Sequence, residues 1–338
     1  MKIITLEEHI ALKTLNQALA KYPCEDARRT ACAASPDLPY FPDMTLFCGI
    51  DARLADMDRH GITKQILSAP VCSGLLPKEE AAAVVRDSND ELAQLVQLHP
   101  DRFGAFAVLP WSDPDAAAKE LERAMTKLRF QGAILTGRPT GGAAFLDDPQ
   151  FASVLEAAEA LRAPIYVHPA APMTTVQKSY YDGLGEQLSA RLSLYGWGWH
   201  HETGIQLLRM ILSGAFEKFP KLQLIAGHWG EMVPFFLSRL DQALPQSVTK
   251  LRRTITETFR QNVSVTPSGI FDYPQLKFCM DVLGADRILH SADFPFIGND
   301  GARPFIEHAP ICASDQEQIA YRNAEALLPC AEAAKSPL

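Results

Sequence analysis

The sequence predicts an α/β protein folded as a (β/α)8 TIM barrel, and three observations support this prediction. Short apolar runs rich in β-branched residues alternate along the chain with longer stretches in which apolar residues recur at helical spacing. The alternation involves eight strand-like runs, which is typical of parallel strands joined by right-handed crossovers. The 338 residues, of which 47% are hydrophobic, show no break in composition, so we expect one domain over residues 1–338. A doubly wound open sheet is the alternative.

The expected elements follow one another in a regular order. The strands are short apolar runs at residues 3–8, 64–68, 102–109, 132–136, 164–168, 222–228, 263–266 and 287–293. Helical spacing and good helix formers mark the segments between them, at residues 51–60, 78–98, 113–127, 149–161, 202–219, 231–244 and 273–283. Helices therefore connect successive strands, as a parallel sheet requires.

Two connections are longer than the others, and both follow a strand: residues 11–49 after the first strand and residues 169–201 after the fifth. Loops that follow the strands of such a barrel surround its catalytic face. We expect the first to be an inserted loop that serves as a lid, and the second, which contains YGWGWHHE, to form an aromatic wall; ordered decoration is the alternative for both. The glycine-rich segment 136–142 lacks the GK[ST] ending of a phosphate loop and is expected to be a turn.

Composition and charge disfavour several classes of function. The formal net charge is -8 and charged residues make up 21%, which disfavours nucleic acid or an anionic membrane as the main partner. No apolar run reaches the roughly 18 residues of a membrane span, and the first residues lack a basic region followed by an apolar stretch, so we expect a cytoplasmic protein. The seven cysteines are scattered without a C-x-x-C pair, which predicts reduced thiols.

The first expected strand ends in three ionisable residues, in the motif LEEH. Alternation along a strand places Glu7 and His9 on one face and Glu8 on the other. A carboxylate and an imidazole on one face can bind a divalent cation, because both offer lone pairs at about 2.0–2.2 Å. A polar strand end in solvent is the alternative. We expect Glu8 to tolerate substitution far better than Glu7.

Histidines and carboxylates also stand at the ends of later strands. IYVHP places His168 at the end of the fifth strand, and ILHSADFPF places Asp293 at the end of the eighth. LIAGHWGE places His228 at the end of the sixth strand, with Glu231 opening the next helix. A single histidine at a strand end is usually structural. Because parallel strands have their carboxyl ends on one rim, polar groups on four such ends predict a metal or acid–base site.

This set of residues resembles that of the amidohydrolase superfamily, whose barrels bind metal through a pair on strand 1, histidines on strands 5 and 6 and an aspartate on strand 8. The usual H-x-H pair is Glu7-x-His9 here. Together with ARLADMDRHGI, HPDRFGAFAVLP, FPKLQLIAGHWGEMVPFFLSRLD and GADRILHSADFPF, this departure is similar to the branch of metal-dependent nonoxidative decarboxylases. That branch includes the γ-resorcylate, 2,3-dihydroxybenzoate, 5-carboxyvanillate and aminocarboxymuconate semialdehyde decarboxylases. The chain departs from it at His290 and Phe294, where other aromatic residues are usual.

The resemblance implies a role for each matching residue. One divalent ion, Zn²⁺ or Mn²⁺, would be bound by Glu7, His9, His168 and Asp293. His228 would contact the substrate beside the metal, with Glu231 as a partner that orients it. Arg53 and Arg239 match family arginines near a substrate carboxylate or at a dimer interface; surface ion pairs with nearby aspartates are the alternative. The resemblance further implies a homodimer or a homotetramer.

The implied reaction is the nonoxidative decarboxylation of an ortho-hydroxybenzoate, a small aromatic carboxylic acid. Two carboxylates and two neutral imidazoles around a dication give a formal charge near zero, so the site can accept an anion. Asp293 would protonate the ring carbon, with His228 and Glu231 as further catalytic groups, before carbon dioxide is lost. An apolar wall for the ring would come from Trp197, Trp199, Phe294 and Phe296; ordinary core packing is the alternative.

Hydrolysis is the alternative reaction for the same groups. A metal-activated water, with Asp293 as general base, could attack a lactone or an amide. A decarboxylase releases carbon dioxide and places a solvent proton on carbon, whereas a hydrolase incorporates solvent oxygen. A barrel that only binds a ligand is a third alternative, which the retention of all the polar groups disfavours.

Overall fold

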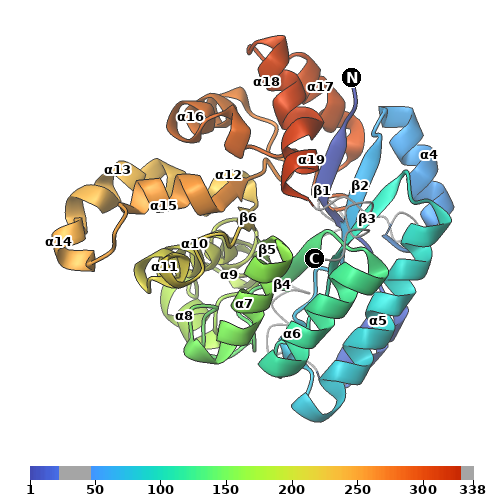
Figure 1. Ribbon diagram of the computed structural model, residues 1–338, viewed down its shortest axis with the longest axis horizontal. Coiled ribbons are helices and arrows are strands. Elements are labelled where there is room, and N and C mark those ends of the chain that lie inside the picture. Colours follow the sequence, from blue (N-terminus) through green and yellow to red (C-terminus); the bar gives the residue numbers. More distant parts are fainter. Residues whose placement is uncertain (23–46, 329–338) are drawn as a thin grey trace.

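A computed structural model of the chain describes residues 1–22 and 47–328 (Figure 1). Its strands form one parallel sheet in which neighbours in the chain are also neighbours in the sheet. They are β1 (Ile4–His9), β2 (Lys64–Ser68), β3 (Phe103–Ala107), β4 (Gly132–Thr136), β5 (Ile165–His168), β6 (Leu224–Ala226) and β7 (Val263–Val265). The strand order runs from first to last without the reversal of a doubly wound sheet, so that alternative is excluded.

The eighth expected strand, residues 287–293, forms a bridged segment rather than a strand. Two single bridges join it to the last and the first strands: Val265 to Ile288 and Leu6 to Ser291. The segment therefore lies between the two ends of the seven-stranded sheet. On its other edge, β1 pairs with β2 and has a register shift between Thr5 and Glu8. The prediction of eight strands is corrected to seven strands and this bridged segment.

Inward-facing side chains fill the interior of the curled sheet. One apolar cluster takes side chains from β1 to β6 and from the bridged segment: Ile4, Leu6, Ile66, Phe106, Ile134, Tyr166, Ile225 and Leu289. Ala324 of α19 (Asn323–Leu327) joins this cluster. Layers of side chains from successive parallel strands are what the core of a β/α barrel requires.

Helices cover the outside of the sheet (Figure 1). The longer ones are α4 (Ile50–His60), α5 (Lys78–Leu98), α6 (Pro114–Arg123), α7 (Ala152–Leu161), α9 (Glu186–Ser193), α10 (Gly198–Leu212), α13 (Val233–Ala243), α15 (Ile255–Asn262) and α16 (Tyr273–Leu283). The shorter ones are α1 (Lys13–Leu19), α8 (Thr174–Tyr180), α11 (Ala215–Lys218), α12 (His228–Glu231), α14 (Gln246–Thr249), α17 (Ala302–Glu307) and α18 (Ala313–Glu317). A second, larger apolar cluster packs these helices against the strands.

Local sequence explains where two of the helices begin. The Asp113 side chain accepts from the Ala116 N–H at 3.3 Å, and Pro114 occupies the first turn of α6. Thr254 and Glu257 form a reciprocal capping box at the start of α15. These caps satisfy backbone groups that the helices themselves leave without partners.

The structure describes the two long connections to different extents. Of the lid predicted at residues 11–49, α1 is described, whereas residues 23–46 lie outside the described residues. The connection at residues 169–201 holds α8, α9 and the first residues of α10. Across the part of the chain that the structure describes, no helix combines the length and apolar character that a membrane crossing requires.

Candidate metal centre

Four polar side chains meet at the carboxyl ends of the strands. Glu7 and His9 come from the end of β1, and His168 comes from the end of β5. Asp293 follows the bridged segment. The ligand-type atoms of the four residues all lie within 4.8 Å of one another. His9 Nε2 is 3.1 Å from Asp293 Oδ1, and His168 Nε2 is 3.7 Å from Glu7 Oε1. The structure thus brings together the four residues that the sequence predicted as metal ligands.

Two of these residues have a backbone conformation that L residues rarely adopt. The φ angle is 63° at Glu7 and 62° at Asp293, in the left-handed region. This conformation costs a non-glycine residue on the order of 1–3 kcal/mol of conformational strain. It is kept only where the surrounding structure imposes it, often at functional sites. At Glu7 this conformation coincides with the register shift in β1. Glu7 therefore reaches the cluster through an irregularity in the strand rather than through regular alternation.

Hydrogen bonds determine which nitrogen of each histidine faces the cluster. His168 Nδ1 lies 2.8 Å from the Pro169 carbonyl oxygen, and His9 Nδ1 lies 3.0 Å from Ser68 Oγ. Because a carbonyl oxygen only accepts, Nδ1 of His168 carries the proton and Nε2 keeps its lone pair. In both rings the Nε2 atom is the one near a carboxylate. A neutral imidazole with a free lone pair is the form that binds a metal ion.

The donor atoms fit a divalent cation. Within residues 1–22 and 47–328, Glu7 Oε1 and His9 Nε2 are buried and have no hydrogen-bond partner. A buried polar atom without a partner costs about 1–3 kcal/mol, which makes such atoms candidates for binding a ligand. Two imidazole nitrogens with two carboxylate oxygens suit Zn²⁺ and are tolerated by Mn²⁺. The cluster is therefore chemically able to hold a metal ion.

Burial shifts the protonation of these groups in directions that bear on metal binding. It raises the pKa of Glu7 to about 8 and that of Asp293 to about 7. It lowers the pKa of His9 to about 3 and holds the pKa of His168 well below its ordinary value. The imidazoles are thus neutral at pH 7, as metal ligands must be. The carboxyl groups need positive charge nearby to be fully ionised, and a dication would supply it.

The second oxygen of Glu7 is held by hydroxyl groups. Glu7 Oε2 accepts hydrogen bonds from Tyr166 and Ser268. Tyr166 is fully buried on β5, and its hydroxyl is also 2.9 Å from Thr266 Oγ1. These bonds leave Glu7 Oε1 as the oxygen next to His168. Neither hydroxyl was expected from the sequence, because both contacts join strands that are far apart in the chain.

Glu8 is buried next to the cluster, contrary to the expectation that it tolerates substitution. Its carboxylate accepts hydrogen bonds from the backbone N–H groups of Ala292, at 3.0 Å, and Phe294, at 3.3 Å. Burial raises the pKa of Glu8 to about 8, although the Ala292 N–H and the charge of Arg53 act in the opposite direction. Glu8 thus ties β1 to the segment that carries Asp293. The expectation of tolerance is corrected, because a strand in this sheet is buried on both faces.

Arg53 and Phe294 lie in the core behind the cluster. Arg53 is fully buried on α4 and donates hydrogen bonds to Gln65 Oε1, at 3.0 Å, and to the carbonyl oxygen of His9. Its guanidinium carbon is 4.8 Å from the centre of the Phe294 ring, which is also buried. Neither side chain has a surface open to a ligand. Both were predicted to bind substrate. The structure places both side chains in the core, and their contact with a substrate stays a prediction.

The remaining aromatic candidates differ in their distance from the cluster. The ring centre of Phe296 is 5.6 Å from that of His9, which places Phe296 beside a metal candidate. Trp197 is 48% exposed at the start of α10. Trp199 packs against Tyr195, with 5.9 Å between the ring centres. Phe296 is therefore the aromatic residue whose predicted contact with a substrate has the most direct geometric support.

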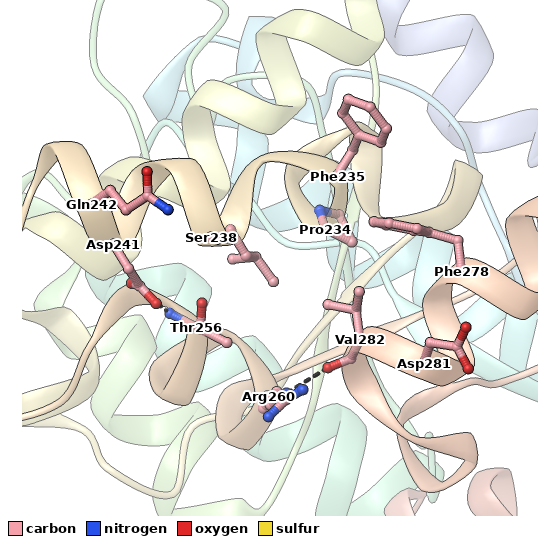
Figure 2. A pocket seen from close by; sticks show the side chains of 11 residues that line it. Pro234, Phe235, Ser238, Asp241, Gln242, Thr256, Arg260, Phe278, Asp281 and Val282 are labelled. Atoms are coloured by element: carbon pink, nitrogen blue, oxygen red, sulfur yellow. Dashed lines mark hydrogen bonds between the residues drawn. The ribbon is translucent and has the colours of Figure 1, made fainter.

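A pocket of about 580 Å³ is lined by residues of α13, α15 and α16, which Figure 2 shows, and none of the four metal candidates lines it. Phe235 and Phe278 line it, and Arg260 donates to the Val282 carbonyl oxygen at 2.5 Å beside it. None of the predicted site residues lines this pocket, including Arg239, which is exposed on α13. The chemistry of the side chains, rather than the volume of a hollow, therefore locates the candidate site.

A second polar cluster consists of His200, His228 and Glu231. His228 Nδ1 is 2.8 Å from Glu231 Oε1, and His200 Nδ1 is 2.7 Å from Glu231 Oε2. The pairing of His228 with Glu231 agrees with the orienting role expected from sequence, whereas His200 was missed. The available signal was the HH pair in YGWGWHHE, which lies in the long connection after the fifth strand rather than at a strand end.

Charge determines the protonation of the second cluster. Burial alone would lower the pKa of His228, but the carboxylate of Glu231 and the hydrogen bond to it raise that pKa to about 9. Burial would raise the pKa of Glu231, but the charges of His228 and His200 outweigh it and lower that pKa. His228 and Glu231 therefore form a buried ion pair at neutral pH when no cation is nearby.

The stabilising effect of this ion pair is expected to depend on pH. The raised pKa of His228 contributes stability that is complete below its ordinary value of 6.5 and is lost as the pH rises through about 9. The lowered pKa of Glu231 contributes stability above its ordinary value of 4.5, which is lost as the pH falls through the lowered pKa.

The free energy of unfolding should therefore differ most between wild type and His228→Asn at pH 4.5 to 6.5, and the difference should shrink toward pH 9. Urea unfolding of the two chelator-treated proteins at each pH measures this difference in the free energy of unfolding. A difference that does not change with pH would contradict the ion pair.

Known proteins match this chain in sequence. The model of the amidohydrolase family matches residues 42–330. A γ-resorcylate decarboxylase from Polaromonas sp. (strain JS666 / ATCC BAA-500) is 36% identical over 287 residues, which cover 82% of this chain and 86% of the relative.

Solved structures match it in fold. The 5-carboxyvanillate decarboxylase from Sphingomonas paucimobilis superposes with a TM-score of 0.87 at 31% identity, over 96% of this chain and 98% of its own. A dihydroxybenzoic acid decarboxylase from Polaromonas sp. JS666, with bound manganese and the inhibitor 2-nitroresorcinol, has a TM-score of 0.82 at 32% identity, over 96% of both chains. The fold described above is therefore shared with these proteins over nearly their whole length.

Proposed function

Because this chain belongs to the amidohydrolase family, we propose that it is a metal-dependent nonoxidative decarboxylase of a hydroxylated aromatic carboxylic acid of the ortho-hydroxybenzoate type. The observation that carries the proposal is the cluster of Glu7, His9, His168 and Asp293, whose two nitrogen and two oxygen ligands lie together at the strand ends. The similar proteins named above are decarboxylases of hydroxylated aromatic acids, which supports the same class of reaction.

We assign one divalent ion per chain, Mn²⁺ or Zn²⁺, to these four residues. Manganese is bound in the related structure from Polaromonas sp. JS666. When bound, the cation would act as a Lewis acid toward the oxygen atoms of an ortho-hydroxybenzoate. The side chains of Glu7 and His9 have no exposed surface, whereas that of Asp293 is 17% exposed. Asp293 is therefore the ligand candidate most open to an entering substrate.

Asp293 is the proton donor of the proposed reaction. Its carboxyl group has two oxygen atoms, so one can bind the cation while the other carries the proton. The proton passes from Asp293 to the ring carbon that bears the carboxylate. The bond from that carbon to the carboxylate then breaks, its electron pair restores the aromatic ring, and carbon dioxide leaves. Solvent returns a proton to Asp293.

His228 and Phe296 assist by binding the substrate. His228 is oriented by its bond to Glu231, and a positive charge on its ring would balance the negative charge of the substrate. Phe296, whose ring centre is 5.6 Å from that of His9, offers an apolar face for the aromatic ring. Both residues thus help to bind an aromatic carboxylate.

The first experiment combines metal analysis with a search for the reaction. Purified protein should contain about one manganese or zinc ion per chain, because four ligands converge on one place. It should release carbon dioxide from one of a panel that includes 2,6-dihydroxybenzoate, 2,3-dihydroxybenzoate and 5-carboxyvanillate. In heavy water, NMR should find deuterium on the ring carbon that lost the carboxylate. A chelator should abolish the activity, and Mn²⁺ or Zn²⁺ should restore it.

Hydrolysis would give a different set of products. Incorporation of ¹⁸O from labelled water into a lactone or an amide, without carbon dioxide from any of the acids, would contradict the decarboxylase and leave the metal centre in place. Protein that binds no divalent ion would contradict the metal centre as well.

A further inference from the structure

His200 lies next to His228 and Glu231, in the first turn of α10. Its ring centre is 4.4 Å from that of His228, and the two ring planes are at 63°. Its Nδ1 is 2.7 Å from Glu231 Oε2, while His228 Nδ1 is 2.8 Å from Glu231 Oε1. Glu231 has no exposed side-chain surface. Each oxygen of this buried carboxylate is therefore paired with a different imidazole.

Both imidazoles present a proton to Glu231. An ionised carboxylate only accepts hydrogen bonds, so each Nδ1 atom at this distance has to carry a hydrogen atom. The lowered pKa of Glu231 is consistent with its ionised state. Because Nδ1 of His228 is used in this bond, Nε2 is the nitrogen that remains for a substrate. The tautomer and the direction of the His228 ring thus depend on where Glu231 is held.

The same three side chains resemble a set of metal ligands, since their ligand-type atoms lie within 4.8 Å of one another. Their hydrogen atoms argue against a second cation here, because a nitrogen that donates to Glu231 has no lone pair for a metal ion. The other ring nitrogen of His200 is also held by the protein. Its Nε2 is 3.0 Å from the Trp199 indole nitrogen, whose N–H donates to it when the ring is neutral. It is also 3.0 Å from the Tyr195 carbonyl oxygen, to which it can donate only when the ring is protonated. His200 is therefore fixed at both ends of its ring.

The turn that carries Glu231 has a strained backbone, which contacts with other segments stabilise. Every residue from 228 to 232 has a positive φ angle, between 48° and 80°, which is strained for all but the glycine. The His228 N–H donates to Ser268 Oγ at 2.9 Å and holds the start of the turn. α10 packs closely against its end, where a Cβ atom on Gly204 would be 2.7 Å from the Glu231 carbonyl oxygen. His200 extends this contact to the Glu231 side chain.

We propose that His200 is a positioning residue, which holds Glu231 in the orientation from which Glu231 directs the His228 ring toward the substrate. The kinetic consequence rests on the proposed decarboxylase function, whereas the hydrogen-bond arrangement does not. Hydrogen-bond partners that orient a working histidine typically account for about 10–100-fold in activity or metal affinity. Loss of His200 would leave Glu231 Oε2 buried without its 2.7 Å donor, and Glu231 would turn to find another.

Two variants separate the hydrogen bond from the shape of the side chain. In His200→Asn, the amide nitrogen takes the place of Nδ1 and keeps a donor for Glu231, whereas His200→Leu fills the space without one. We expect His200→Leu to lower kcat by about 10–100-fold with little change in KM or metal content. His200→Asn should recover most of kcat. His201→Leu, one residue along the same turn of α10, is the matched control and should keep the wild-type kcat.

A second measurement tests the hydrogen bonds of His200 and His228 independently of enzymatic activity. In protein labelled with ¹⁵N at histidine and loaded with Zn²⁺, the Nδ1–H groups of His200 and His228 should give slowly exchanging NMR signals. The His200→Asn and His228→Asn variants assign them. In His200→Leu the His228 signal should shift or disappear through faster exchange, whereas in His201→Leu it should not change. If the wild-type protein shows both signals but releases no carbon dioxide, the proposed function fails and the positioning role of His200 stands.

Several results would overturn the proposal. A kcat and a His228 signal in His200→Leu equal to those of His201→Leu would exclude a positioning role. Equal losses in His200→Asn and His200→Leu would mean that the ring shape, not the hydrogen bond, matters. Loss of metal from His200→Leu in proportion to activity would make His200 a metal ligand. Absence of the His200 Nδ1–H signal from the wild-type spectrum would overturn the proposal even if His200→Leu does not fold.

Discussion

Replacement of Asp293 by asparagine is expected to lower kcat by about 10²–10⁴-fold while the protein keeps its fold, because general acid–base groups typically contribute that much. Asparagine has the shape of aspartate and keeps an oxygen near His9, whose Nε2 is 3.1 Å from Asp293 Oδ1. It cannot carry the acidic proton that the proposed reaction delivers to the ring carbon. Assays of carbon dioxide release measure the loss, and circular dichroism verifies the fold.

Glu7→Ala is the companion variant, because it tests metal binding rather than proton transfer. Glu7 supplies one of four ligands from a buried position, and its Oε1 lies 3.7 Å from His168 Nε2. We expect Glu7→Ala to lose both bound metal and activity, whereas Asp293→Asn keeps most of its metal. A fully active Glu7→Ala would contradict the metal centre. A fully active Asp293→Asn would remove Asp293 from the role of proton donor.

Glu8→Leu is expected to destabilise the protein by about 1–3 kcal/mol, which is the usual cost of leaving a buried hydrogen-bonding group without its partner. It leaves the fully buried Arg53 without the opposing charge of Glu8. It also leaves the N–H groups of Ala292 and Phe294 without their acceptor. Urea unfolding measures the change in the free energy of unfolding. A change below about 1 kcal/mol would mean that Glu8 behaves as an ordinary surface residue.

A double-mutant cycle identifies the source of this cost. If the charge of the fully buried Arg53 dominates the cost, Glu8→Leu combined with Arg53→Leu should be more stable than Glu8→Leu alone. Glu8→Gln is the milder control, since its amide oxygen keeps one acceptor for the backbone N–H groups. If the double variant is no more stable than the single variant, the backbone contacts rather than the charge of Arg53 dominate.

The four metal candidates could be predicted from the sequence because their placement follows one rule. The carboxyl ends of parallel strands lie on the same rim, so residues at those ends meet even when the strands are far apart in the chain. IYVHP and ILHSADFPF each show an apolar run that ends in a polar residue, His168 or Asp293. The same rule places Glu7 and His9 with them.

The same reasoning did not predict the surroundings of residues that distant segments cover. Alternation along β1 places Glu8 on the face opposite Glu7, where we expected tolerance to substitution, but the backbone of residues 292–294 covers it. Arg53 and Phe294 match positions expected near a substrate, and the structure packs them on each other in the core. His200 stands at no strand end, and its contact with Glu231 lies 31 residues along the chain.

By itself the sequence determined the order of the strands and the polar residues at their carboxyl ends, since both depend on local patterns of apolar and polar residues. Tertiary structure alone decided that Glu8 is buried near Arg53, that His200 bonds to Glu231, and that residues 288–291 bridge the two ends of the sheet. The partners of Glu8 lie 57 residues away at Gln65 and 284 residues away at Ala292. Whether a polar side chain meets solvent, an opposite charge or a ligand depends on the segments that pack over it, and a local pattern contains no information about those segments.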